Sequence, residues 1–211
     1  MESSQEIEGR NHMKIIGITG GVGCGKSEVL AWIEKNYDAA VVRADDVGRD
    51  LMRPGTGCFR KITALFGNDC LCPDGTLNRP WIADRIFSDP EQRDALDAII
   101  HPAVRLEIQR LILQNTACGW KYFFLESALL IEENYNEICD EMWYIHADAA
   151  VRAARLKEGR GYSEEKTRSV MRNQLPEHVF REKCQVVIDN SGSFAHTTAQ
   201  IEARMAALEE A

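Results

Sequence analysis

The chain has 211 residues, and 25 Lys and Arg stand against 33 Asp and Glu, which gives a formal net charge of −8. The hydrophobic fraction of 45% and the charged fraction of 27% are typical of a globular protein and exclude a disordered one. No apolar run reaches the roughly 20 residues of a membrane span. The acidic balance argues against a dedicated nucleic-acid binder. We therefore expect neither a membrane nor a nucleic acid as partner.

Seven cysteines occur without a CxxC pair and without the Cys and His spacing of a zinc site. In a chain of this length, that pattern indicates reduced thiols and a cytoplasmic location. The segment Ile7–Arg10 resembles a protease-cleavage linker. We therefore interpret residues 1–12 as an added leader and Met13 as the natural start.

Short apolar runs that alternate with helical patterns predict an α/β protein with a parallel sheet flanked by helices. The expected strands are Lys14–Ile18, Ala40–Val42, Tyr122–Leu125, Met142–Ile145 and Val186–Ile188. Apolar residues at helical spacing predict a first helix, with Val29, Leu30, Ile33 and Tyr37, and a last helix, with Phe194, Ile201, Met205 and Leu208. Between the second and third strands, helical stretches flank the turn-rich loop Cys72–Gly75. There Pro102 is expected to break or kink the helical pattern.

Residues 20–27 read Gly-Gly-Val-Gly-Cys-Gly-Lys-Ser and match the P-loop pattern G-x-x-x-x-G-K-[ST] at every fixed position. An expected strand precedes this segment and an expected helix follows it. Backbone N–H groups of such a loop cradle phosphates, and the helix N-terminus adds partial positive charge. Lys26 is placed to reach the β- and γ-phosphates, and the Ser27 hydroxyl to ligate Mg²⁺. The motif predicts binding of a nucleoside triphosphate.

A carboxylate, Asp45, follows the second expected strand, where open α/β sheets bind ligands. It could accept the proton of an attacking hydroxyl group, or Asp45 and Asp46 could merely cap a helix. Residues 151–183 carry nine Lys and Arg against five Glu. This basic segment is either a solvated face or a mobile element that closes over phosphates. The GTPase motifs D-x-x-G and N-K-x-D are absent, so a small-molecule kinase is the leading interpretation.

Several short segments match one kinase family in order and spacing. They are Ile16–Gly21 before the P-loop, Ala44-Asp45, Asp74–Arg79, Ile86-Phe87, Ile100–Pro102, Glu126–Leu130, Gln174 and Ile188–Gly192. On these segments the chain resembles the dephospho-coenzyme A kinase family along nearly its whole length from Met13. The resemblance implies that ATP phosphorylates the ribose 3′-hydroxyl of dephospho-CoA, the last step of coenzyme A synthesis.

The resemblance also implies three parts within one kinase domain, residues 13–211. A nucleotide-binding core would comprise residues 13–50, 118–150 and 184–211, with an acceptor-binding helical region at about 51–117 and a lid at about 151–183. The cofactors would be ATP and Mg²⁺. The implied catalytic residues are Asp45 as base, Lys26, and Arg155 or Arg160 in the lid. The implied binding residues are Gly20, Gly21, Val22, Gly23, Cys24, Gly25, Lys26, Ser27 and Asn190 for the nucleotide, Arg79, His101 and Leu129 for the acceptor, and Ser27 for Mg²⁺.

Departures from the family pattern leave some roles open. Arg43 stands where many members have an aspartate, and Arg155–Arg160 does not align on the R-x-x-x-R spacing of the lid. On the residues alone, His101 could be an ordinary helix histidine, Arg79 a surface residue and Asn190 a turn former. The competing functions are another P-loop small-molecule kinase, for a nucleoside monophosphate or a sugar, and a nucleotide-binding switch without catalysis.

Overall fold

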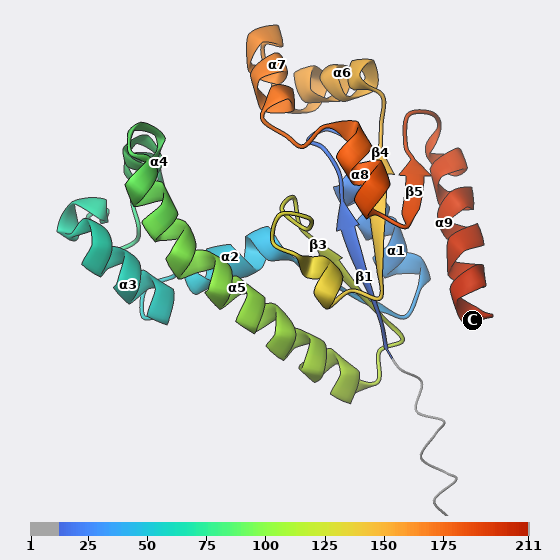
Figure 1. Cartoon of the computed structure of the whole chain (residues 1–211), viewed down its shortest axis with the longest axis horizontal. Helices are drawn as coiled ribbons and strands as arrows, with labels where there is room; N and C mark the ends of the chain where they lie inside the picture. The colour runs from blue at the N-terminus through green and yellow to red at the C-terminus, as the bar shows by residue number, and fades with distance from the viewer. Residues whose placement is uncertain (1–12, 211) are drawn as a thin grey trace, which may run out of the picture. The chain divides into compact units, whose positions relative to one another are not determined.

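The computed structural model describes residues 13–210, so the expected leader at residues 1–12 lies outside the described residues. Five strands form one parallel sheet in the order β2-β3-β1-β4-β5 (Figure 1). Each strand overlaps one that the sequence predicts, which confirms the α/β class. The strands are β1 (Lys14–Thr19), β2 (Ala39–Arg43), β3 (Tyr122–Glu126), β4 (Glu141–His146) and β5 (Val186–Asp189).

Nine α-helices and two short 3₁₀ helices connect the strands within the described residues. None of these helices is both long enough and apolar enough to cross a membrane. The helices are α1 (Lys26–Asn36), α2 (Ala44–Leu51), α3 (Gly57–Phe66), α4 (Arg79–Ser88), α5 (Pro90–Cys118), α6 (Ala149–Arg160), α7 (Glu164–Arg172), α8 (Glu177–Lys183) and α9 (Phe194–Glu209), with 3₁₀ turns η1 (Asn68–Cys70) and η2 (Tyr135–Glu137).

The chain forms two compact units. The first unit contains the described residues up to Val41 and from Thr116 onward, and the second contains Val42–Asn115. The basic segment that the sequence singles out forms α6, α7 and α8 of the first unit. The second unit includes residues 42–50, which the sequence analysis assigns to the core, together with nearly all of the expected acceptor region.

The core of the first unit is a layer of side chains between the sheet and the helices α1 and α9. Ile16 and Ile18 of β1 alternate toward this layer, as expected for a strand whose successive side chains face opposite sides of the sheet. The expected helix faces are confirmed, because Val29, Leu30 and Ile33 of α1 are fully buried. On the other face, Phe180 of α8 stacks on Tyr144 of β4, with ring centroids 4.8 Å apart and an interplanar angle of 9°. Side chains of β4 thus pack on both faces of the sheet.

The second unit has its own apolar core, formed by side chains of α3, α4 and α5, with Ile62 fully buried at its centre. Of the two expected effects of Pro102, a break or a kink, the break is wrong, because α5 runs from Pro90 to Cys118 with this proline inside it. A proline costs the helix one backbone hydrogen bond. Apolar side chains before and after Pro102, among them Leu96 and Ala103, belong to the same core cluster. Their packing offsets the loss.

Candidate active site

The P-loop joins the end of β1 to the start of α1, as the sequence predicts. Gly25 precedes the first residue of α1 and has φ 93°, a left-handed conformation that glycine adopts without a steric cost. A Cβ atom at Gly25 would collide with the side-chain amide of Asn190, and a Cβ atom at Gly20 would collide with the carbonyl oxygen of Ile145. The loop therefore needs glycines because neighbouring strand ends approach its backbone closely.

Lys26 extends across the mouth of this loop. Its Nζ donates a hydrogen bond to the Gly20 carbonyl oxygen at 2.7 Å and lies 3.7 Å from Oε1 of Glu126. The side chains of Lys26 and Glu126 are only 14% and 16% exposed, so the charge pair is partly shielded from solvent. The cation is thus held over the loop, where the phosphates of a nucleotide would bind.

Glu126 is a further candidate for the site, and the sequence did not single it out by itself. It ends β3, and β3 pairs with β1 so that Ile18 lies opposite Glu126. In P-loop proteins a carboxylate on a strand near the loop helps to hold Mg²⁺. The signal in the sequence is four apolar residues, Tyr122–Leu125, followed directly by a carboxylate. Because this carboxylate stands alone, a search for an Asp-Glu pair after the strand does not find Glu126.

The helix α6 packs directly on the P-loop. Arg152 donates from Nε to the Val22 carbonyl oxygen at 2.9 Å and from Nη2 to Oε1 of Gln174. Its guanidinium group lies so close to Gly21 that a Cβ atom there would collide with it. Arg152 therefore lies directly against the P-loop and joins Arg155 and Arg160, which the sequence predicts for the lid, as a candidate for contact with phosphates.

Arg155 and Asn190 hold the P-loop through hydrogen bonds. Arg155 Nη2 donates to the Asn190 carbonyl oxygen at 2.9 Å, and Asn190 Nδ2 donates to the Cys24 carbonyl oxygen at 2.8 Å. Thr197 Oγ1 donates to Asn190 Oδ1 at 2.8 Å, and the Asn190 side chain is buried. Both ends of this amide are thus engaged inside the protein. These bonds hold Asn190 against the P-loop, so its side chain does more than form a turn, and its contact with the nucleotide stays a prediction.

We predict that Asn190→Ala lowers the free energy of unfolding by about 1–3 kcal/mol, because the buried Cys24 carbonyl and the Thr197 hydroxyl each lose the shorter of two hydrogen bonds. Urea denaturation measures this change. Asn173→Ala, at the exposed end of α7, is the matched control and should stay within about 0.5 kcal/mol of the parent. An Asn190→Ala variant as stable as the parent would show that the brace contributes nothing.

The donor groups near the loop fit Mg²⁺, which prefers oxygen ligands. Ser27 presents an exposed hydroxyl group on the first turn of α1, and Glu126 supplies a carboxylate at the end of β3. The described residues contain no cluster of three or more His, Cys, Asp or Glu side chains able to hold a metal ion. A Mg²⁺ ion here would therefore take some of its oxygen ligands from the protein and the others from the phosphates of the nucleotide.

Asp45 and Asp46 lie in the first turn of α2, directly after β2. Neither residue caps the helix, because Arg43 is the N-cap residue and no side chain accepts a capping bond there. Asp46 forms an ion pair with Arg49 at 2.9 Å, and Asp45 is exposed. Asp45 therefore remains the candidate base that the sequence predicts, with its carboxylate accessible.

The other predicted site residues differ in how far they are exposed to solvent. Arg79 is exposed at the first position of α4, and Leu129 is 43% exposed in the loop after β3. His101 lies inside α5, with Nε2 3.6 Å from Oδ1 of Asp97 one turn earlier. Arg160 is exposed at the end of α6. Cys24 is 1% exposed, so its thiol faces the core and the P-loop contributes its backbone there.

A parallel α/β sheet with a P-loop, a lysine held across that loop and an arginine-bearing helix packed over it defines the class of P-loop kinases. The sequence profile of dephospho-CoA kinases matches residues 14–196. The chain therefore belongs to the dephospho-CoA kinase family.

Individual relatives agree with this assignment. The dephospho-CoA kinase of Symbiobacterium thermophilum is 38% identical over 191 residues, which cover 90% of this chain and 80% of that protein. The dephospho-CoA kinase of Syntrophotalea carbinolica is 35% identical over 196 residues and covers 93% and 92% of the two chains. The crystal structure of TT1252 from Thermus thermophilus superposes with a TM-score of 0.78 at 30% identity, over 93% of this chain and 98% of that one.

Proposed function

We propose that the protein transfers the γ-phosphoryl group of ATP to the ribose 3′-hydroxyl of dephospho-CoA, giving coenzyme A and ADP. The observation that carries the proposal is the position of Lys26 across the glycine loop, between Gly20 and Glu126. Family membership supports the choice of acceptor. In the reaction, a bond forms between the 3′-oxygen and the γ-phosphorus, and the bond between this phosphorus and ADP breaks.

The protein contributes mainly position and charge, because phosphoryl transfer through a loose transition state needs little covalent chemistry from the enzyme. Backbone N–H groups of Gly20–Ser27 would hold the β- and γ-phosphates, and Lys26 would exchange its bond to the Gly20 carbonyl for phosphate oxygens. Ser27 and Glu126 would hold Mg²⁺, which when bound supplies positive charge to the phosphates. The lid, residues 149–183 with α6–α8, would close over the nucleotide.

Asp45 would accept the proton of the 3′-hydroxyl group as the oxygen attacks. Arg79, His101 and Leu129 are the proposed contacts to the acceptor. The exposure of Asp45 and Arg79 supports these roles, because a side chain that binds substrate has to be reachable from solvent. We also propose a cytoplasmic location, since all seven cysteines are free thiols and persist as such in a reducing compartment.

Arg152, rather than Arg160, should bind the triphosphate. We predict that Arg152→Ala raises the KM for ATP about tenfold, because a charged donor over the P-loop is lost. Steady-state kinetics with ATP varied measures this effect. The control is Arg160→Ala, which removes an exposed guanidinium group at the end of α6 and should leave the KM unchanged. A larger effect of Arg160→Ala would reverse the assignment.

A panel of acceptors tests the proposed function. ADP release from ATP is measured with dephospho-CoA, AMP, CMP and gluconate offered separately at equal concentrations. We expect rapid turnover with dephospho-CoA alone. Turnover with AMP, CMP or gluconate, without any with dephospho-CoA, would reassign the protein to another kinase activity. ATP binding without turnover on any acceptor would support the nucleotide switch instead.

A further inference from the structure

A histidine lies at the point where the lid joins the sheet. His146 ends β4, and α6 begins three residues later at Ala149. The imidazole is 11% exposed, and the backbone carbonyl of His146 accepts a hydrogen bond from the Asn190 N–H at 2.8 Å. The residue is therefore fixed to the same segment that braces the P-loop. Neither the motif nor the reaction described above uses its side chain.

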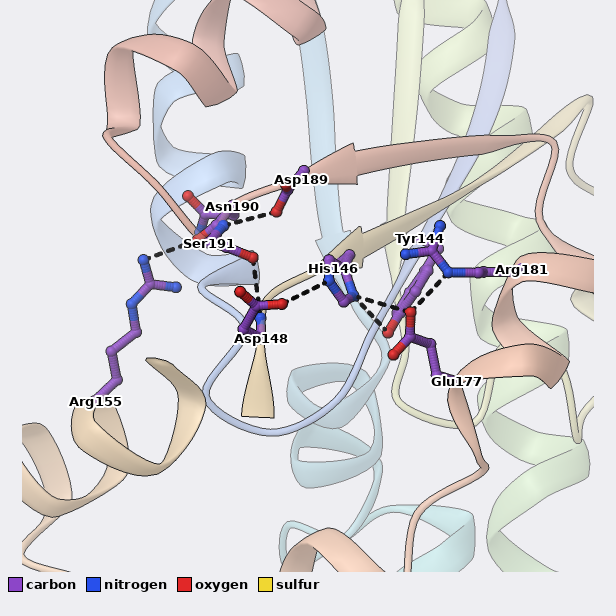
Figure 2. Close-up of polar contacts among 9 residues, drawn as sticks. All are labelled: Tyr144, His146, Asp148, Arg155, Glu177, Arg181, Asp189, Asn190 and Ser191. Atoms are coloured by element: carbon purple, nitrogen blue, oxygen red, sulfur yellow. Dashed lines mark hydrogen bonds and ion pairs between the residues drawn. The ribbon is translucent and has the colours of Figure 1, made fainter. Parts of the chain in front are cut away.

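The imidazole faces two carboxylates, one just before α6 and one at the start of α8 (Figure 2). Its Nε2 lies 3.5 Å from Oδ1 of Asp148, the residue before α6, and its Nδ1 lies 3.7 Å from Oε1 of Glu177, the first residue of α8. The Tyr144 hydroxyl lies 3.3 Å from the same Nδ1. Nδ1 thus has two alternative partners, a hydroxyl group that can donate to it and a carboxylate that can accept from it.

The protonation state of the imidazole decides between these partners. A neutral imidazole has one donor and one acceptor nitrogen, and a protonated one donates from both. In the neutral state, Nδ1 can accept from Tyr144 while Nε2 donates to Asp148. In the protonated state, both nitrogens can donate, so Asp148 and Glu177 are both attracted to the same ring. Protonation would therefore connect the residue before α6 and the first residue of α8 to the end of β4.

The other charged groups around the ring keep their charge in the range where imidazoles titrate, ordinarily between pH 5 and 8. Arg181 donates to Glu177 at 2.7 Å and, with a smaller contribution from His146, lowers the pKa of that carboxyl group. Hydrogen bonds from Ser191 lower the pKa of Asp189 on β5. Burial, with the charge of Glu177, raises the pKa of Tyr144 to about 12.

The sign of the pH effect follows from these groups and from Arg152, whose charge also favours the ionised form of Glu177. Carboxyl groups with a lowered pKa stay ionised until the pH falls below their ordinary values, near 4. Tyr144 stays neutral and the arginines stay charged throughout. Between pH 8 and pH 5, the shifted groups around the ring therefore hold a constant charge.

We propose that His146 is a positioning residue that fastens the start of α6 and the start of α8 to the sheet and does so more firmly at low pH. The inference depends on the proposed function only in that the lid closes over ATP. It predicts that the opening equilibrium of residues 149–183 shifts toward the closed state as the pH falls. The pairs are partly exposed, so we expect about a fivefold change in the opening equilibrium.

Hydrogen exchange of the nucleotide-free protein tests the proposal independently of the acceptor. Protection of residues 149–183, corrected for the intrinsic pH dependence of exchange, is measured at pH 5.5 and pH 8.5 for the parent, His146→Gln and His178→Gln. His178 is exposed on α8 and serves as a matched control. We expect protection to rise about fivefold at low pH in the parent and in His178→Gln, but not in His146→Gln.

The pH dependence of the KM for ATP gives a second readout, because it distinguishes the proposed role of His146 from a general structural one. A structural defect in His146→Gln would shift the KM equally at all pH values, whereas the proposal predicts a variant whose KM differs from the parent at pH 5.5 and converges with it at pH 8.5. Parent protection that does not change with pH would overturn the proposal. So would a His146→Gln variant that keeps the full pH dependence.

Discussion

Replacing Lys26 by alanine should reduce kcat by about 10³-fold, the scale expected when a charge on the transferring phosphoryl group is lost. In the structure, the Lys26 ammonium group lies over the P-loop and contacts the Gly20 carbonyl oxygen and the Glu126 carboxylate. It contributes nothing to the apolar core, so the fold should survive. Steady-state kinetics, with circular dichroism and a melting temperature to confirm folding, measures the effect.

Lys35→Ala is the control for this experiment. Lys35 lies in the last turn of the same helix α1 and is exposed, so its loss removes an equal charge away from the loop. We expect activity close to that of the parent. A folded Lys26→Ala variant with nearly normal turnover would contradict the assignment of the phosphate site.

Replacing Asp45 by asparagine should reduce kcat by about 10²–10⁴-fold, the range for loss of a general base. Asparagine keeps the shape of the side chain but cannot accept the proton of the 3′-hydroxyl group. The KM for ATP should change little, because the P-loop determines nucleotide binding. Measurement of kcat and of the two KM values separates these effects.

Asp46→Asn is the matched control, one residue further along α2. Its carboxylate is already paired with Arg49, and an exposed pair of this kind contributes little, so a mild effect is expected. If Asp46→Asn loses activity and Asp45→Asn does not, the two roles are exchanged. If both variants turn over normally, neither residue is the base.

Much of the fold follows from local patterns in the sequence. The five strands, the P-loop and the buried faces of α1 and α9 are predictable because each depends on residues close together in the chain. Pro102 is the exception. Its local effect is to break a helix, but side chains on both sides of it pack into one core, and tertiary packing outweighs the lost hydrogen bond.

The site is less predictable, because its contacts join distant segments. Arg152 reaches the carbonyl of Val22, 130 residues away in the chain, and Asn190 reaches that of Cys24, 166 residues away. The sequence identifies a basic segment but cannot rank its arginines, since their contacts depend on how α6 packs on the loop. Glu126 could have been found from the apolar strand that precedes it.

The position of the new phosphate group on the product tests the central claim most directly. The purified protein is incubated with ATP and dephospho-CoA, and the product is examined by mass spectrometry and ³¹P NMR. The proposed function predicts a gain of one phosphoryl group, with a new phosphomonoester signal coupled to the ribose 3′-proton. An unchanged acceptor, or a phosphate at any other position, would contradict it.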